Sequence, residues 1–460
     1  MPGLVSEMSI GKFIDGRLLT RFQIGIITCC ALVNALDGMD TQSIGVAAPF
    51  IAKGLNVKLA HFGPIFAIAL LGAVIGAASF GPLADRIGRK VLLVFATIVI
   101  GVFTLLTAFA NSVPDLMVFR FLAGIGLGGA TPCFIALTSE FAPQRLRATL
   151  VTVMWSAFPL GAMIGGFLNS YLIAEMGWRA IFYLGGVLPL ALAIVLAVYL
   201  PESIKFILTR RNDPAAVHKI VTRFGPPFVA AGTRFVMDEE SMAGFPIRHL
   251  FTEGRAMGTI LLWVPFFMGF GILTVAVLWT PALLHLNGIS PRATAFVVAF
   301  NGLGAFIGQS IAGRLIERFG IIVVLVPAFV LGAAATAGLG YGASSVGLAA
   351  MFIGLIGLFV GLGSAGAIAL SASIYPTAIR STGIGLGMAM GRLGQVIGPL
   401  IAGALLSAGW TAGGIMLVIA IGSLVAAVFV AMLKVWMTRR RDVVSTETGG
   451  TLKTVAPFDA

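Results

Sequence analysis

Charged residues are scarce in this chain. Asp, Glu, Lys and Arg make up 10% of its 460 residues, whereas hydrophobic residues make up 58% and the mean hydropathy is +1.02. A typical soluble domain has about 25% charged residues. This composition excludes a soluble globular protein and predicts an integral membrane protein.

Cysteine and histidine are also rare, which excludes several kinds of site. Cys29, Cys30 and Cys133 fall in apolar stretches and suggest neither a disulfide framework nor a CxxC metal motif. The four histidines are dispersed along the chain. Because an integral-membrane enzyme needs clustered nucleophile, metal or acid–base residues, we expect no enzymatic activity, no metal and no cofactor.

Apolar stretches long enough to cross a bilayer recur along the chain. A helix of about 20 apolar residues spans the hydrocarbon core. Twelve stretches meet this length and are predicted to be transmembrane helices: 22–52, 62–82, 91–110, 116–139, 148–173, 180–200, 258–284, 293–313, 321–342, 345–372, 382–407 and 411–436.

Lys and Arg concentrate in alternate loops between these stretches. With the N-terminus placed inside the cell, 24 of the 30 Lys and Arg residues fall on the cytoplasmic side, as the positive-inside rule requires. We therefore predict that both termini are cytoplasmic and that the protein lies in the cell inner membrane. The net charge of +12 is explained by this bias and indicates no nucleic-acid partner.

The chain repeats itself at an offset of 232 or 233 residues. GPLADRIGRK at 81–90 matches GRLIERFG at 313–320, and PLGAMIGG at 159–166 matches RLGQVIGP at 392–399. Parallel repeats of six helices predict an all-α fold of twelve transmembrane helices in two pseudo-symmetric bundles. The predicted parts are a bundle at 1–200, a cytoplasmic central loop at 201–257, a second bundle at 258–437 and a cytoplasmic tail at 438–460.

The loop GPLADRIGRK has the residues of an ionic latch. Gly81 permits close approach of a neighbouring helix, and Asp85 can accept hydrogen bonds from a helix N-terminus or pair with an arginine. The alternative is that these are solvated loop charges. The residues assigned to the latch, to SEFAPQRLRAT at 139–149 and to their second-repeat counterparts are Gly81, Asp85, Arg86, Gly88, Arg89, Glu140, Arg147, Glu317, Arg318 and Arg380.

Four charged residues inside the predicted spans have no counterpart in the other repeat. They are Asp37, Asp40, Arg120 and Arg392. A charge at the bilayer centre costs about 2.5–3.5 kcal/mol on insertion scales, so such residues face an interior cavity or pair with one another. Their asymmetry indicates that they serve function and are not required to build the repeat.

Asp37 and Asp40 lie one helical turn apart near the middle of their span. Two carboxylates this close in a low-dielectric cavity cannot both ionise cheaply, so one of them can carry a proton. The alternative is a pair of structural aspartates that accept hydrogen bonds from neighbouring helices.

The two arginines predict an anion site. Arg392 lies near mid-depth, where a guanidinium suits a carboxylate, although it could instead pair with Asp37 or Asp40. Arg120 either binds substrate or extends its side chain to the membrane interface. Polar and aromatic residues on the interior-facing spans add candidates for substrate contact, each of which could equally be a packing residue: Gln42, Trp155, Trp279 and Asn301, with Phe158, Phe270, Gln309 and Gln395 as further members.

DGMDTQSIGVAAP at 37–49, GPLADRIGRK and GRLGQVIGP at 391–399 together resemble the aromatic acid:proton symporter family of the major facilitator superfamily. The resemblance implies that Asp37 and Asp40 are essential for proton-coupled uptake and that Arg120 and Arg392 affect transport of the carboxylate. It further implies that the 81–90 loop holds a cytoplasmic gate. The expected partners are protons, a small aromatic carboxylate such as a benzoate or hydroxybenzoate, and the lipid bilayer, with a monomeric chain.

Other transport functions stay open at this point. The substrate could be another small organic acid or a sugar, because sugar porters also carry an aspartate in the first helix. A proton antiporter that exports organic compounds would use the same fold, but the fifth-span sequence GAMIGG lacks the proline-containing glycine pattern expected of exporters.

Overall fold

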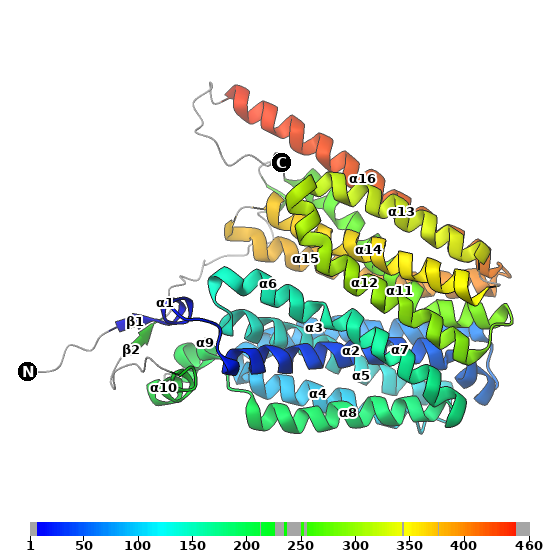
Figure 1. Ribbon diagram of the computed structural model, residues 1–460, viewed down its shortest axis with the longest axis horizontal. Coiled ribbons are helices and arrows are strands. Elements are labelled where there is room, and N and C mark those ends of the chain that lie inside the picture. The colour runs from blue at the N-terminus through cyan, green and yellow to red at the C-terminus, as the bar shows by residue number, and fades with distance from the viewer. Residues whose placement is uncertain are drawn as a thin grey trace, which may run out of the picture. The chain divides into compact units, whose positions relative to one another are not determined.

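The computed structural model describes residues 7–211, 213–225, 234–236, 250–252, 255–342, 345–375 and 377–447. Twelve helices in these ranges are long and apolar enough to cross a membrane, which confirms the predicted number of spans (Figure 1). In the first repeat they begin with α2 (Arg21–Gly54), α3 (Phe62–Ile87), α4 (Arg89–Thr107), α5 (Val113–Phe141), α6 (Gln144–Trp155) with α7 (Ala157–Glu175), and α8 (Trp178–Tyr199). In the second repeat they are α11 (Ala256–Leu286), α12 (Pro291–Phe319), α13 (Ile321–Gly342), α14 (Val346–Ile374), α15 (Thr377–Ser407) and α16 (Ala412–Glu447).

The fifth span is broken into α6 and α7, whereas the sequence predicted one helix. Pro159 has no backbone N–H and its ring clashes with the carbonyl four residues earlier, so a helix cannot continue smoothly through it. The carbonyl oxygens of Met154 and Trp155 both accept hydrogen bonds from the Asn34 amide of α2, each at 3.0 Å. The side-chain amide of Asn34 thus satisfies the backbone carbonyls at the break.

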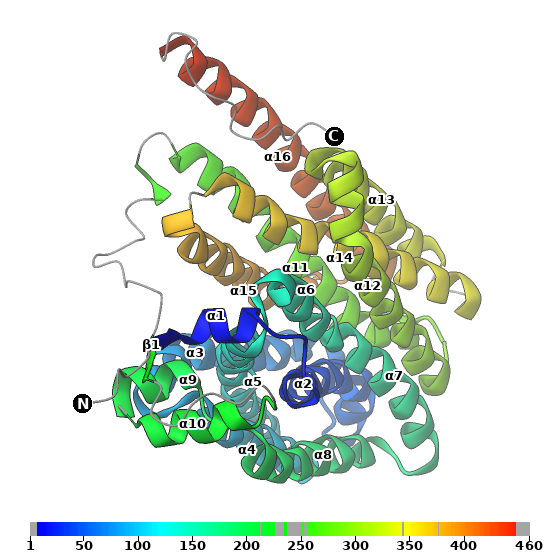
Figure 2. The ribbon, with the colours of Figure 1, turned by 60° about the vertical axis from the view of Figure 1, so that its left-hand side comes forward.

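Short elements outside the spans were not predicted. The N-terminal segment forms strand β1 (Glu7–Ser9) and helix α1 (Ile10–Asp15), and the central loop forms α9 (Ile204–Phe206), the π-helical η2 (Ile207–Arg211), α10 (Pro214–Thr222) and strand β2 (Arg234–Val236). β1 and β2 pair in parallel, and Figure 2 shows β1 and α1 beside α9 and α10. Phe13 of α1 packs edge-on against both Phe224 and Phe235. A further short helix, η1 (Leu59–His61), precedes α3.

The described chain separates into two compact units. Unit 1 contains Met1–Asp40, Ile68–Gly161 and Arg179–Ser241, and unit 2 contains Thr41–Ala67, Ala162–Trp178 and Met242–Ala460. These bounds cross the predicted six-plus-six division, because Thr41–Ala67 and Ala162–Trp178 belong to unit 2. We call those two ranges the distal segments.

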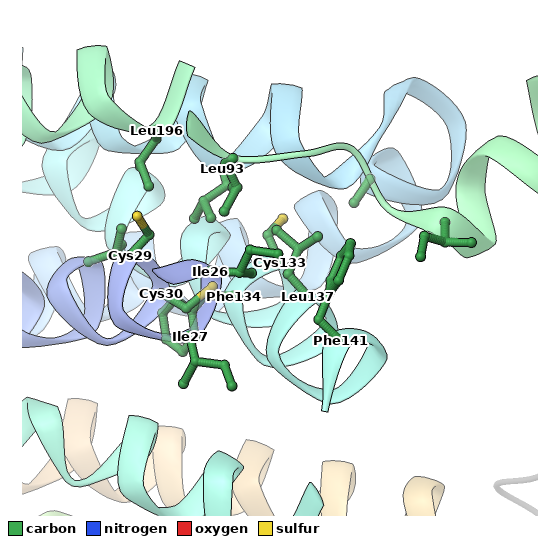
Figure 3. Packing of buried hydrophobic residues seen from close by; sticks show 14 of the residues in the cluster. Ile26, Ile27, Cys29, Cys30, Leu93, Cys133, Phe134, Leu137, Phe141 and Leu196 are labelled. Atoms are coloured by element: carbon green, nitrogen blue, oxygen red, sulfur yellow. The ribbon is translucent and has the colours of Figure 1, made fainter. Parts of the chain in front are cut away.

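The core of unit 1 is an apolar cluster drawn from its transmembrane helices and from α1, α9 and α10. Figure 3 shows its centre, where Cys30 and Cys133 lie among Ile26, Leu93 and Phe134. All three cysteines are buried and unbonded. They act as packing residues, as the sequence predicted.

The internal repeat recurs in the packing of each unit. In unit 1, Gly72 and Gly76 of α3 lie against the carbonyls of Phe121 and Ile125 on α5. In unit 2, Gly304 and Gly308 of α12 lie against the carbonyls of Gly354 and Leu358 on α14. The glycine pairs are offset by 232 residues and the carbonyl pairs by 233. The two sequence repeats therefore pack the corresponding helices together closely in the same way, through small residues.

The distal segments pack against the second repeat within unit 2. Gly45 of α2 lies against the backbone of Val277 and Leu278 on α11, since a Cβ at Gly45 would be 2.9 Å from the Leu278 Cα. Gly63 meets the Pro399 carbonyl of α15 in the same way. Within unit 2, the last part of α2 and the residues after it therefore pack against α11 and α15.

Candidate functional site

Asp40 and Arg120 form a buried ion pair in unit 1. The Arg120 Nη1 and Nη2 donate to the two Asp40 carboxylate oxygens at 3.1 and 2.5 Å, and each side chain is only 1% exposed. The Thr104 hydroxyl of α4 donates to Asp40 Oδ1 at 2.9 Å. Helices α2, α4 and α5 are thus joined by one carboxylate, in the two-pronged geometry that suits a guanidinium.

This pairing answers one question left by the sequence. Arg120 does not extend to the membrane interface, because its side chain is buried. Its ion-pair partner is Asp40, whereas the sequence had offered only Arg392 as a structural partner for the aspartates. The burial cost of each charge is offset by the other, so removing one partner alone leaves an uncompensated charge. Arg120 Nε has no acceptor in the described part of the chain.

Asp37 lies one turn before Asp40 on α2 and is also buried, but less completely, with 8% of its surface exposed. Asp40 is held by Arg120 and Thr104, so the two carboxylates have different surroundings.

Arg392 lies on α15 in unit 2 and is partly buried. Its neighbour Gly391 leaves room for the Phe270 ring of α11, which a Cβ at Gly391 would meet at 2.9 Å. Gln395 lies three residues after Arg392, on the same helix face, and its buried Oε1 has no partner among the described residues. Arg392 and Gln395 therefore share one face of α15, and the Phe270 ring of α11 lies against the backbone of Gly391. The expected convergence of Arg392 with the aspartates stays a prediction.

The other predicted substrate residues take part in packing. Trp279 is fully buried, donates from Nε1 to the Pro399 carbonyl at 3.1 Å and meets Phe66 edge-on. Asn301 donates to the Ile353 carbonyl at 3.3 Å. Trp155 is partly buried beside Phe134. Their contact with substrate stays a prediction.

Gln42 differs from these residues, since it is fully buried and neither of its amide atoms has a partner within the described ranges. Nearby, Asn169 donates to the Ser43 hydroxyl at 3.2 Å while its own Oδ1 lacks a donor in the same described part. Buried amides with unmet hydrogen bonds are costly in a native structure. Gln42 is therefore the polar side chain of the distal segments that we expect to gain a further hydrogen-bond partner.

The loop between α3 and α4 forms an ionic cluster within unit 1. Arg89 pairs with Glu140 of α5 and lies 3.4 Å from Asp85. Ser203 donates to Glu140 Oε2 at 2.7 Å. Glu202 Oε1 accepts the backbone N–H groups of Arg89 and Lys90 at 2.8 and 3.0 Å, so its negative charge caps the N-terminus of α4.

Sequence reasoning missed Glu202 and Ser203. The signal was the tripeptide PES at 201–203, directly after a predicted span. Gly88 has φ +110°, and a Cβ there would strike the Glu202 carboxylate, which explains the glycine.

Other parts of the predicted latch are not assembled. A Cβ built on Gly81 meets no described atom within 4 Å, so the close approach predicted there is not seen. Arg86, Glu317 and Arg318 are exposed. Asp85 is exposed too, but it pairs with Arg89 as the sequence predicted. The side chain of Arg380 lies outside the described residues.

Comparison with known proteins identifies the family. The model of the Major Facilitator Superfamily matches residues 30–287 and 266–458. The chain is 34% identical over 406 residues to the 4-hydroxybenzoate transporter PcaK of Pseudomonas putida, which covers 88% of this chain and 91% of that protein. The chain belongs to the major facilitator superfamily, in its aromatic acid:proton symporter family. The predicted family and fold class are confirmed.

Other relatives agree with this membership, and a solved structure agrees with the fold. The chain is 33% identical to a gallate transporter of Pseudomonas putida over 89% of this chain and 91% of that protein, and 32% identical to a benzoate transport protein of Acinetobacter baylyi over 87% of each. A crystal structure of a D-xylose–proton symporter superposes with a TM-score of 0.70 at 19% identity, over 88% of this chain and 97% of that one. This major facilitator is a transporter and not an enzyme.

Proposed function

We propose that this transporter takes up a small aromatic carboxylate, such as a benzoate or hydroxybenzoate, together with protons. The substrate class is supported by sequence identity. The chain is about one-third identical, over nearly its whole length, to transporters named for 4-hydroxybenzoate, gallate and benzoate. The likeness to xylose symporters is at 19% identity, which supports the fold alone.

The residue roles in this proposal follow from the differing surroundings of the charges. Arg392 binds the carboxylate. The Gln395 amide on the same helix face and the Phe270 ring against Gly391 suit an aromatic ring with a polar substituent. Asp37 carries the proton. The Asp40–Arg120 pair holds α2, α4 and α5 together beside Asp37, so a proton or an anion that competes for one partner changes how these helices are joined.

The proposed setting is the cell inner membrane, with both termini in the cytoplasm and the chain as a monomer. The distribution of Lys and Arg supports this orientation. In this orientation the packed distal segments lie on the side facing away from the cytoplasm. Alternating access requires those contacts to open when substrate enters.

Counterflow in proteoliposomes tests the substrate class. Liposomes loaded with unlabelled 4-hydroxybenzoate should take up external radiolabelled 4-hydroxybenzoate, and benzoate and gallate should compete. Arg392→Gln should lose this exchange, whereas Arg292→Gln, at an exposed position outside the site, should keep it. Exchange of xylose with no exchange of any aromatic acid would overturn the proposal in favour of a sugar.

A further inference from the structure

A cavity of about 530 Å³ lies within unit 1, apart from the intramembrane charges. Its walls come from α1, the first residues of α4 and α6, the end of α5, and α9. Its volume is that of a small-molecule site. Because α4 begins and α5 ends at this cavity, it lies at the level where transmembrane spans give way to the loops.

The acidic groups that line the cavity are Glu140 and Asp15. Glu140 pairs with Arg89 and accepts a hydrogen bond from Ser203. Asp15 of α1 accepts the backbone N–H of Gln144 at 2.5 Å, at the start of α6. Glu140 is thus already paired with a cation, whereas Asp15 is exposed and has a hydrogen bond to the backbone.

Arg147 is the lining residue whose charge is not compensated. Its side chain is partly buried, its Nε is inaccessible to water, and no hydrogen-bond or ion-pair partner for it occurs among the residues that the structure describes. Lys205 of α9 lines the same cavity. A guanidinium suits an acceptor with several oxygens, because it can bind two of them through parallel hydrogen bonds.

We propose that this cavity binds a phosphate group, held by Arg147 and Lys205. Two basic side chains suit a group that carries up to two negative charges and presents three oxygens. The group comes either from inorganic phosphate or from the headgroup of an anionic phospholipid, whose depth matches the ends of the spans. Ile10 and Ile14 of α1 form an apolar wall of the cavity, so an occupied cavity also fixes the N-terminal segment in place.

Calorimetric titration of the purified full-length protein with sodium phosphate tests the proposal. Sodium chloride at matched ionic strength is the reference. Arg147→Gln should weaken phosphate binding by about tenfold or more, because a charge-assisted hydrogen bond is lost, and Arg147→Lys should recover part of it. The matched control is Arg210→Gln, which removes the same charge from an exposed residue outside the cavity.

Lipid nanodiscs distinguish the two sources of phosphate. If the ligand is a headgroup, native mass spectrometry should show phosphatidate retained by the parent protein and lost from Arg147→Gln, with inorganic phosphate competing. If the ligand is free phosphate, its binding should persist unchanged in purely zwitterionic lipid. The proposal is overturned if Arg147→Gln and Arg210→Gln bind both phosphate and phosphatidate equally well. Thermal unfolding of each variant without ligand shows whether it is folded.

Discussion

At the scale of single residues, burial separates the four intramembrane charges into two kinds. Asp40 and Arg120 satisfy each other inside unit 1, whereas Asp37 and Arg392 are the less enclosed carboxylate and guanidinium. The sequence was enough to identify the four charged residues, because a charge within an apolar span can be recognised from the sequence alone. It could not predict that Asp40 meets Arg120, since that contact depends on how α2 and α5 are rotated.

The Asp40–Arg120 pair is tested by a double-mutant cycle on thermal stability. Arg120→Gln should lower the free energy of unfolding by about 3–5 kcal/mol, because Asp40 is then buried without a counter-charge. Asp40→Asn combined with Arg120→Gln should restore much of the loss. Unfolding midpoints of the purified variants measure this. A double variant that is as unstable as the sum of the single variants would show that the two side chains do not interact.

Arg392 is tested by a substitution that keeps its charge. Arg392→Lys cannot bind a carboxylate through two parallel hydrogen bonds, so we expect KM for 4-hydroxybenzoate to rise about tenfold, which corresponds to roughly 1.4 kcal/mol. Initial rates of uptake at several substrate concentrations check this against Arg292→Lys. An unchanged KM would remove Arg392 from the substrate site.

At the scale of secondary-structure elements, long apolar helices were predictable and short amphipathic ones were not. The spans exceed the length of a bilayer core, so their pattern is strong. α1, α9 and α10 are short, and they are held by contacts such as Phe13 with Phe224 that join distant parts of the chain. The break between α6 and α7 had a local signal in Pro159, but its backbone is satisfied by Asn34 of another helix.

The start of α4 is tested at Gly88. Gly88→Ala should destabilise the protein by about 1–2 kcal/mol, because an L-residue is strained at φ +110°, and the new methyl group also meets Glu202. Gly81→Ala is the matched control, since its methyl group meets no described atom. Unfolding midpoints that fall equally in both variants would contradict the capping role of Glu202 at Gly88.

At the scale of the whole molecule, the repeat was predicted but the boundaries of the compact units were not. Gly72 and Gly304 show that each repeat packs its helices alike. The distal segments nevertheless belong with the second repeat, because Gly45 and Gly63 let backbones touch there. An internal sequence match cannot reveal such contacts, because they depend on how the helices pack.

The role of the distal contacts is tested at Gly45. Gly45→Leu places a bulky side chain against the backbone of α11, so that end of unit 2 cannot close, and we expect counterflow to fall at least about tenfold. Gly347→Leu is the control, because a Cβ there meets nothing described within 4 Å. Normal exchange by a folded Gly45→Leu protein would show that this contact is not part of the transport cycle.

Coupling of aromatic acid uptake to proton uptake through Asp37 is tested most directly by internal pH. Proteoliposomes that contain a pH-sensitive dye should acidify inside when 4-hydroxybenzoate is added at a pH at which the free acid is negligible, and protein-free liposomes correct for passive entry. Asp37→Asn should abolish this acidification and uphill accumulation while retaining counterflow, and Asp40→Asn should also abolish accumulation. Acidification by Asp37→Asn at the rate of the parent protein would contradict the account.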